Sequence, residues 1–125
     1  MIRFAGYAAL FDRVDRGGDV IRRGAFAGAT APVPLYWQHD PRRRIGTVET
    51  LTEDARGLRV IGSSDAPVAA GTGLSFGYRV RAARHGTYRE LNDLDLIEVS
   101  LVAAPMQPLA RVHFVETQAG EDNDL

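Results

Sequence analysis

The 125-residue sequence contains no cysteine and no lysine. The absence of cysteine excludes disulfides, thiolate zinc sites and thiol nucleophiles. The absence of lysine excludes Schiff-base chemistry, a Walker A phosphate loop and a serine–lysine dyad, and all 15 basic residues are arginine. Only three histidines are present, so few side chains could act as a general base at neutral pH. Any covalent chemistry must therefore use a nucleophile other than cysteine or lysine.

Long apolar runs are also missing, which predicts an ordinary soluble domain with no transmembrane helix and no signal peptide. We expect it to work in a cytoplasm-like compartment. The length suits one domain with a single modest core, which we place in residues 1–115. Residues 116–125 are polar and acidic, and we expect them to form a flexible tail. Because four acidic residues lie in this tail, the body of the chain is mildly basic.

Short segments with period-two alternation predict a mostly β domain. The expected strands cover residues 2–10, 35–39, 45–51, 58–62, 76–82, 88–91, 94–102 and 110–115, with one short helical turn near Ala25. Residues 63–73 lack a full apolar period and are predicted to be a loop with at most one helical turn. The pattern alone permits either a β-sandwich or a barrel that closes to remove its edges.

His39 is the leading candidate for a general base. It follows the apolar segment Leu35–Trp37 and precedes Asp40-Pro41, a pair that disfavours helix, so we expect it at the end of a strand. Packing of that strand would hold the imidazole at the edge of a cleft. The structural alternative is a partly buried polar residue with no chemical role. His85 and His113, in a turn and near the end of the body, are weaker candidates.

Ser75 is the candidate nucleophile. It lies between Gly73 and Gly77, and small neighbours let a substrate carbonyl approach the backbone amides. The spacing differs from the G-x-S-x-G elbow, which excludes an α/β-hydrolase site. The structural alternative is a serine that begins a strand. Ser100 is a second possible nucleophile, but its bulky apolar neighbours favour a buried strand serine.

Glu98 stands among apolar residues in the segment LIEVSLV. An unpaired buried charge costs several kcal/mol, so this carboxylate must face solvent or find a partner, and pairing with His39 would orient the imidazole. Other kinds of site have weaker support. Arg42–Arg44 lack an aromatic stacking surface, which argues against nucleic-acid binding. No two histidines have metal-ligand spacing, so we expect neither a metal nor a cofactor.

Four segments, taken together, resemble the HK97-type prohead protease family, in the version found in gene transfer agents and prophages. They are GYAALFDRVDRGGDVIRRGAF (6–26), PLYWQHD (34–40), GLSFGYRV (73–80) and LIEVSLVAAPMQPLARV (96–112), in the order of that family. The resemblance implies a mainly β, α+β fold: a closed β-barrel with a few short helices, like that of the herpesvirus assemblins. Carried over residue by residue, it implies a triad of Ser75, His39 and Glu98.

The same resemblance implies a function. The chain would be a serine endopeptidase of capsid maturation that cleaves the scaffold or N-terminal segment of the major capsid protein, and itself, inside the prohead in the bacterial cytoplasm. It would contact other copies of itself, with a homodimer allowed, and would need no nucleic acid or membrane. The family usually has a helix of about three turns before the serine, where this chain has the short segment 63–73. The alternative is therefore a non-catalytic capsid-assembly or scaffold-binding barrel derived from the protease.

Overall fold

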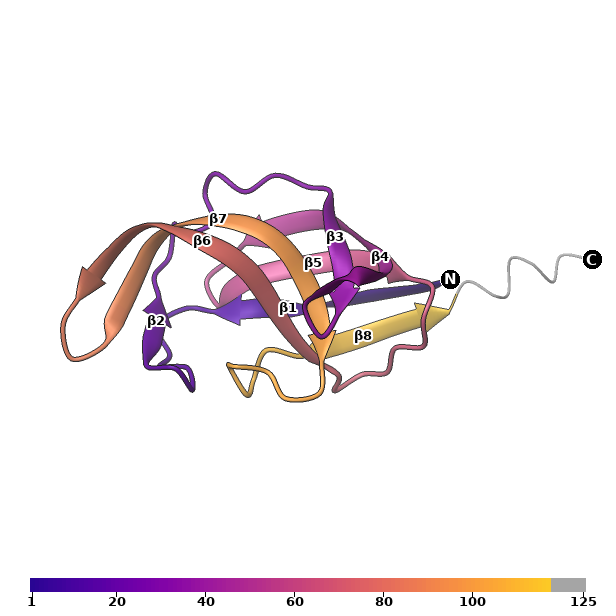
Figure 1. Cartoon of the computed structure of the whole chain (residues 1–125). Coiled ribbons are helices and arrows are strands. Elements are labelled where there is room, and N and C mark those ends of the chain that lie inside the picture. Colours follow the sequence, from indigo (N-terminus) through magenta and orange to yellow (C-terminus); the bar gives the residue numbers. More distant parts are fainter. Residues whose placement is uncertain (118–125) are drawn as a thin grey trace, which may run out of the picture.

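The computed structural model describes residues 1–117, which form one twisted sheet of eight strands (Figure 1). The strands are β1 (Ile2–Leu10), β2 (Asp19–Ile21), β3 (Val33–Trp37), β4 (Asp40–Glu53), β5 (Gly57–Ser64), β6 (Gly73–His85), β7 (Arg89–Val102) and β8 (Val112–Thr117). Within residues 1–117 no segment is helical, so the expected helical turn near Ala25 is wrong: residues 23–28 form turns. None of the described residues belongs to a helix that could cross a membrane.

Strand β7 organises the sheet because it pairs on both of its edges. The strand order is β2-β7-β3-β4-β5-β1-β8, and β6 pairs with β7 off this path. β2 and β3 run parallel to β7 at its two ends, through residues 89–91 and 99–101. β6 and β7 form a long antiparallel hairpin, and β2 pairs with β7 near the far end of this hairpin (Figure 1). The end of β7 near Val102 therefore meets both β3 and β6.

The expected closed barrel is wrong, because the sheet is open. β6 and β8 approach each other only at an isolated bridge between Gly73 and Arg111. Three hydrogen bonds of 2.8 Å support the contact: Leu74 N–H donates to the Ala110 carbonyl, Val112 N–H to the Thr72 carbonyl, and Gly71 N–H to the Val112 carbonyl. The loop between β7 and β8, residues 103–111, contains two prolines that cannot donate a hydrogen bond to a strand ladder. The chain therefore leaves the sheet after β7 and rejoins it at β8.

The core is made of aliphatic side chains on the inner face of the sheet, joined by Phe4 and Phe26. Phe26, from the turns after β2, packs edge-on against Phe76 of β6 with ring centroids 5.2 Å apart. Each fully buried aliphatic side chain contributes about 1.5–3 kcal/mol to stability. The largest fully buried residues are Phe4, Ile21, Leu35, Leu58, Leu74, Leu91, Leu94, Leu101, Val48, Val60, Val99 and Val112.

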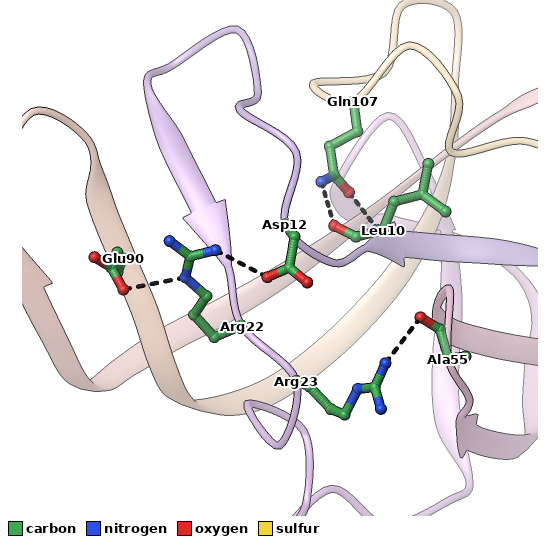
Figure 2. Close-up of polar contacts among 7 residues, drawn as sticks. All are labelled: Leu10, Asp12, Arg22, Arg23, Ala55, Glu90 and Gln107. Atoms are coloured by element: carbon green, nitrogen blue, oxygen red, sulfur yellow. Dashed lines mark hydrogen bonds and ion pairs between the residues drawn. The ribbon is translucent and has the colours of Figure 1, made fainter.

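Gln107 fixes the loop 103–111 to the end of β1. Its buried side-chain amide accepts a hydrogen bond from Leu10 N–H and donates one to the Leu10 carbonyl, both at 2.8 Å (Figure 2). The amide thus replaces the neighbouring strand that Leu10 would otherwise need to satisfy its backbone groups. Nearby, Arg22 joins Asp12 to Glu90 and so ties the loop after β1 to the start of β7 (Figure 2).

The expected strand over residues 2–10 coincides with β1, whereas the expected strands over 88–91 and 94–102 form one strand, β7. The polar pair Asn92-Asp93 does not break β7, because register shifts against residues 80–83 of β6 absorb it. Glu116 and Thr117 of the expected tail belong to β8 and pair with β1. The rest of the tail, 118–125, lies outside the described residues.

Candidate active site

His39 lies in the two-residue turn between β3 and β4. Trp37 pairs with Asp40, so the turn consists of Gln38 and His39, whose φ angles are 53° and 61°. Two successive left-handed residues are characteristic of the type I′ turn, which normally uses Asn-Gly. Left-handed backbone costs about 1–2 kcal/mol for each residue other than glycine. The Gln38-His39 turn therefore depends on support from its surroundings.

The support comes from β7 and the residue that follows it. Gln38 N–H donates to the Leu101 carbonyl at 2.9 Å. The Gln38 side-chain oxygen accepts a hydrogen bond from Ala103 N–H at 2.6 Å, and His39 N–H donates to Ser100 Oγ at 3.1 Å. These three hydrogen bonds hold the turn against the end of β7 and fix the backbone of His39, from which the imidazole extends.

Glu98 of β7 lies beside the imidazole of His39. His39 Nδ1 is 2.6 Å from Glu98 Oε2, and Ser100 Oγ donates to the other carboxylate oxygen, Oε1, at 2.7 Å. Glu98 is 6% exposed, whereas the His39 side chain is 43% exposed. The hydrogen bond that Glu98 accepts from His39 raises the pKa of His39 above 6.5; burial opposes this rise and the negative charge of Glu98 adds to it. The pair is a buried carboxylate with a partly exposed imidazole, the arrangement that stabilises an imidazolium.

Ser75 of β6 lies on the same face of the sheet. It pairs in register with Ser100, and Gly77 pairs with Glu98. Side chains directly opposite each other on antiparallel strands have Cβ atoms about 5 Å apart, so Ser75 is a neighbour of the residue that contacts both His39 and Glu98. Within residues 1–117, no hydrogen bond joins Ser75 to His39.

The hydroxyl of Ser75 remains accessible although the residue as a whole is only 8% exposed. Every fully buried side-chain nitrogen or oxygen in residues 1–117 has a hydrogen-bond partner, and Ser75 Oγ has none, so this oxygen reaches solvent. A cavity of about 50 Å³ adjoins Ser75, and its other lining residues include Leu74, Phe76, Tyr78 and Met106. Ser75 is therefore an unpaired hydroxyl beside a small, largely apolar hollow.

Gly77 is required by the position of Glu98. A Cβ added at Gly77 would overlap Glu98 Oε2 and lie 2.9 Å from Glu98 Cδ. The sequence interpretation assigned the two glycines near Ser75 to the approach of a substrate. The structure gives Gly77 a different role, which is to leave room for the carboxylate.

The chain can now be compared with known proteins. The sequence model of the caudovirus prohead serine proteases matches residues 1–124. The chain belongs to this family. The prohead protease of Enterobacteria phage HK97 is 38% identical to it over 64 residues, a match that covers 47% of this chain and 28% of the phage protein.

The fold of the chain is also found in solved herpesvirus protease structures. It is similar to KSHV protease, solved in complex with a hexapeptide phosphonate inhibitor, with a TM-score of 0.67 and 14% identity, over 94% of this chain and 66% of the other. A second KSHV protease structure gives a TM-score of 0.56 and 16% identity, over 94% and 62% of the two chains. The expected assemblin-like fold is confirmed in its mostly β character, without the closed barrel and the short helices. The chain spans less than two thirds of the length of each of these relatives.

The remaining sequence candidates lie elsewhere in the prohead serine protease fold. His85 ends β6 at the tip of the hairpin and pairs with Arg89, and His113 is on β8 beside Tyr7. Arg42–Arg44 are exposed on β4. In the part of the chain that the structure describes, no three metal-ligating side chains gather. Sequence reasoning missed the supporting role of Ser100, although the spacing Glu98-x-Ser100 already places both side chains on one face of a strand.

Proposed function

We propose that the chain is a serine endopeptidase in which Ser75 is the nucleophile, His39 the general base and Glu98 the carboxylate that orients the imidazole. The observation that carries the proposal is the 2.6 Å contact between His39 Nδ1 and Glu98 Oε2. Because Nδ1 is engaged, Nε2 is the nitrogen left for proton transfer. Membership of the prohead serine protease family supports peptide-bond hydrolysis as the reaction.

In this mechanism Ser75 Oγ attacks the carbonyl carbon of a peptide while His39 Nε2 takes the hydroxyl proton. Glu98 stabilises the resulting imidazolium through the hydrogen bond to Nδ1. His39 then returns the proton to the leaving amine, and a water molecule activated in the same way releases the acyl group from Ser75. The small hollow beside Ser75 would receive a side chain next to the scissile bond.

The proposal requires His39 Nε2 to reach Ser75 Oγ when a substrate is bound. Catalytic hydrogen bonds are often long or unformed in free enzymes and tighten in the substrate complex. Ser75 is the cross-strand partner of Ser100, which already contacts the backbone of His39, and this neighbourhood supports the proposal. Rotation of the exposed imidazole, or a small shift of the Gln38-His39 turn, would complete the triad.

The substrates that we propose are the scaffold or N-terminal segment of a phage major capsid protein, and the protease itself, cleaved inside the assembling prohead in the bacterial cytoplasm. The support is the family to which the chain belongs and its similarity to the HK97 prohead protease. Contacts between copies, including a homodimer, form part of the same proposal. Removal of segments needed only for assembly would make capsid maturation irreversible.

The test is reaction of the full chain with a fluorophosphonate probe, together with incubation with the cognate capsid protein. We expect the wild-type chain to be labelled and to cleave the capsid protein, and Ser75→Ala and His39→Ala to do neither. Ser63→Ala, on β5, is the matched control and should behave as wild type. Labelling or cleavage that survives Ser75→Ala in a folded chain would refute the assignment.

The second candidate is a non-catalytic module that binds capsid or scaffold protein. Two observations favour it: no hydrogen bond joins Ser75 to His39 among the described residues, and residues 65–72 form a loop where the family usually has a helix. This candidate predicts binding of the capsid protein without hydrolysis. Any cleavage that depends on Ser75 excludes it.

A further inference from the structure

The outer surface of β5, β1 and β8 carries a cluster of basic side chains away from the His39–Glu98 pair. Arg59 of β5 pairs in register with Tyr7 of β1, and the ring of Tyr7 lies 5.8 Å from that of His113 on β8. The guanidinium of Arg56, from the β4–β5 turn, sits over the Tyr7 ring at 4.9 Å from its centroid. Three side chains therefore surround Tyr7, and all three carry or can acquire positive charge.

Two adjacent cavities open at this cluster. The first, of about 240 Å³, is lined by Tyr7, Arg56, Arg59, Leu109, Arg111 and His113. The second, of about 230 Å³, is lined by Leu10, Phe11, Arg13, Ala55, Arg56 and Leu109. Both include Arg56 and Leu109, so the two cavities adjoin each other, and together we call them the Tyr7 groove.

The arginines of the Tyr7 groove have no acidic partner within it. Across the residues that the structure describes, no ion pair involves Arg13, Arg56 or Arg59. The hydrogen bonds of the Arg111 side chain go to two backbone carbonyls, those of residues 108 and 71. By contrast, the guanidinium of Arg89 is paired with the Asp19 carboxylate at 2.7 Å.

The one carboxylate close to the groove, Asp54, is already engaged. Its Oδ2 accepts the hydroxyl proton of Tyr7, and its Oδ1 accepts hydrogen bonds from the backbone N–H groups of Arg56 and Gly57. The electrostatic effect of the arginines is visible at His113, whose pKa is lowered by burial and then by repulsion from Arg59 and Arg56. The Tyr7 groove is therefore lined by four arginines with Asp54 as a neighbouring carboxylate, so positive charge predominates in it.

The groove is also held in shape. Gln107 fixes the loop that carries Leu109 and Arg111 to the end of β1 (Figure 2). The two carbonyl contacts of Arg111 restrain its side chain further. Arg56 is restrained by its stacking over Tyr7. Groups that are ordered before binding lose less conformational entropy when a ligand arrives.

We propose that the Tyr7 groove binds an acidic peptide segment, with one carboxylate in each cavity. Guanidinium groups match carboxylates in geometry and form charge-assisted hydrogen bonds with them. On an extended peptide, side chains two residues apart point the same way and are separated by roughly 7 Å, a spacing suited to two adjoining cavities. Leu109, 59% exposed between the cavities, offers an apolar contact for the stretch that joins the two acidic residues.

A peptide fits this groove better than a nucleic acid does. Single-stranded nucleic acids bind through aromatic rings on which bases stack. The aromatic ring in the groove, Tyr7, is already engaged by Arg56 and His113. The whole chain has a net charge of −1, so it lacks the overall positive field that draws polyanions to a surface.

The experiment measures fluorescence anisotropy of a labelled decapeptide with aspartate at alternate positions, added to the full-length chain. We expect saturable binding, and loss of about one charge-assisted contact, seen as a roughly tenfold weaker Kd, in Arg59→Gln and in Arg56→Gln. Arg84→Gln, which removes the same charge from the exposed end of β6, is the matched control and should bind as wild type. The corresponding asparagine peptide should not bind.

A second measurement follows the ring protons of His113 by NMR. The charged groups that face it are Arg56 and Arg59, so a bound carboxylate should raise its pKa, and binding should tighten as the pH falls. Equal binding by wild type and Arg59→Gln would overturn the proposal. So would displacement of the peptide by inorganic phosphate at the same concentration, or tighter binding of an oligonucleotide of equal charge.

Discussion

The carboxylate of Glu98 occupies the space above Gly77, its cross-strand partner on β6. One strand thus supplies both the serine of the candidate site and, two residues later, the gap that the acid of that site fills. Gly77 is therefore linked to Glu98 by steric fit, and through Glu98 to His39.

Substitution of this glycine tests the link. In Gly77→Ala the new Cβ would overlap Glu98 Oε2, so the carboxylate must leave its position or β6 and β7 must separate. We expect fluorophosphonate labelling to fall at least tenfold and the free energy of unfolding in urea to drop by about 1–3 kcal/mol. Gly28→Ala, where a Cβ meets nothing within 4 Å, is the control. Unchanged labelling of Gly77→Ala would show that Glu98 does not position the base.

The pH dependence of labelling should report the His39–Glu98 pair. His39 must be neutral to accept a proton, and its pKa is raised above 6.5 mainly by the hydrogen bond to Glu98. Labelling should therefore increase with pH around a midpoint above 6.5, and Glu98→Gln should move the midpoint down. The ring of His113, whose pKa is lowered for unrelated reasons, provides an internal NMR control that Glu98→Gln should not shift.

The same pair affects stability. Because the pKa of His39 is higher in the folded chain than its unfolded value of 6.5, the protonated pair stabilises the fold fully below pH 6.5. This contribution is lost as the pH rises through the folded pKa. Urea titrations of wild type and Glu98→Gln should differ most at acidic pH and converge at alkaline pH. A difference that grows with pH would contradict the assignment.

The substitution Ser100→Ala tests whether Ser100 supports the His39–Glu98 pair or is itself the nucleophile. The change removes the acceptor for His39 N–H and the donor to Glu98 Oε1, so we expect a loss of about 1–3 kcal/mol in the free energy of unfolding and slower labelling. Ser63→Ala is the control, because that hydroxyl bonds to the partly exposed Glu49. If Ser100→Ala abolished labelling while Ser75→Ala retained it, Ser100 would be the nucleophile.

The positions of the strands could be predicted from the sequence better than the pairing between strands. Period-two alternation places β1 and β6 because it follows from the geometry of a single strand. The parallel pairing of β3 with β7 has no such local signal: the two strands are far apart in sequence, and no turn type marks their contact. The expected barrel came from the family resemblance, whereas the sheet of this chain is open.

Residue chemistry pointed to His39, Ser75 and Glu98 as candidates, but it could not predict which residues contact them in the folded chain. Gln38-His39 lacks the Asn-Gly sequence that usually predicts a type I′ turn. Its left-handed backbone is instead supported by contacts with Ser100, Leu101 and Ala103, which are distant in sequence. The steric role of Gly77 likewise depends on which residue lies opposite, and therefore on a register that only the folded sheet defines.

The parallel contact between β3 and β7 also determines when the candidate site can exist. His39 and Glu98 are 59 positions apart, and they meet only after β7 has paired with β3 on one edge and β6 on the other. Contacts of such long range form late and slowly in folding. During synthesis, a chain that has not yet released Val102 from the ribosome cannot complete this end of the sheet. The His39–Glu98 pair therefore cannot assemble before the seventh strand has joined the sheet.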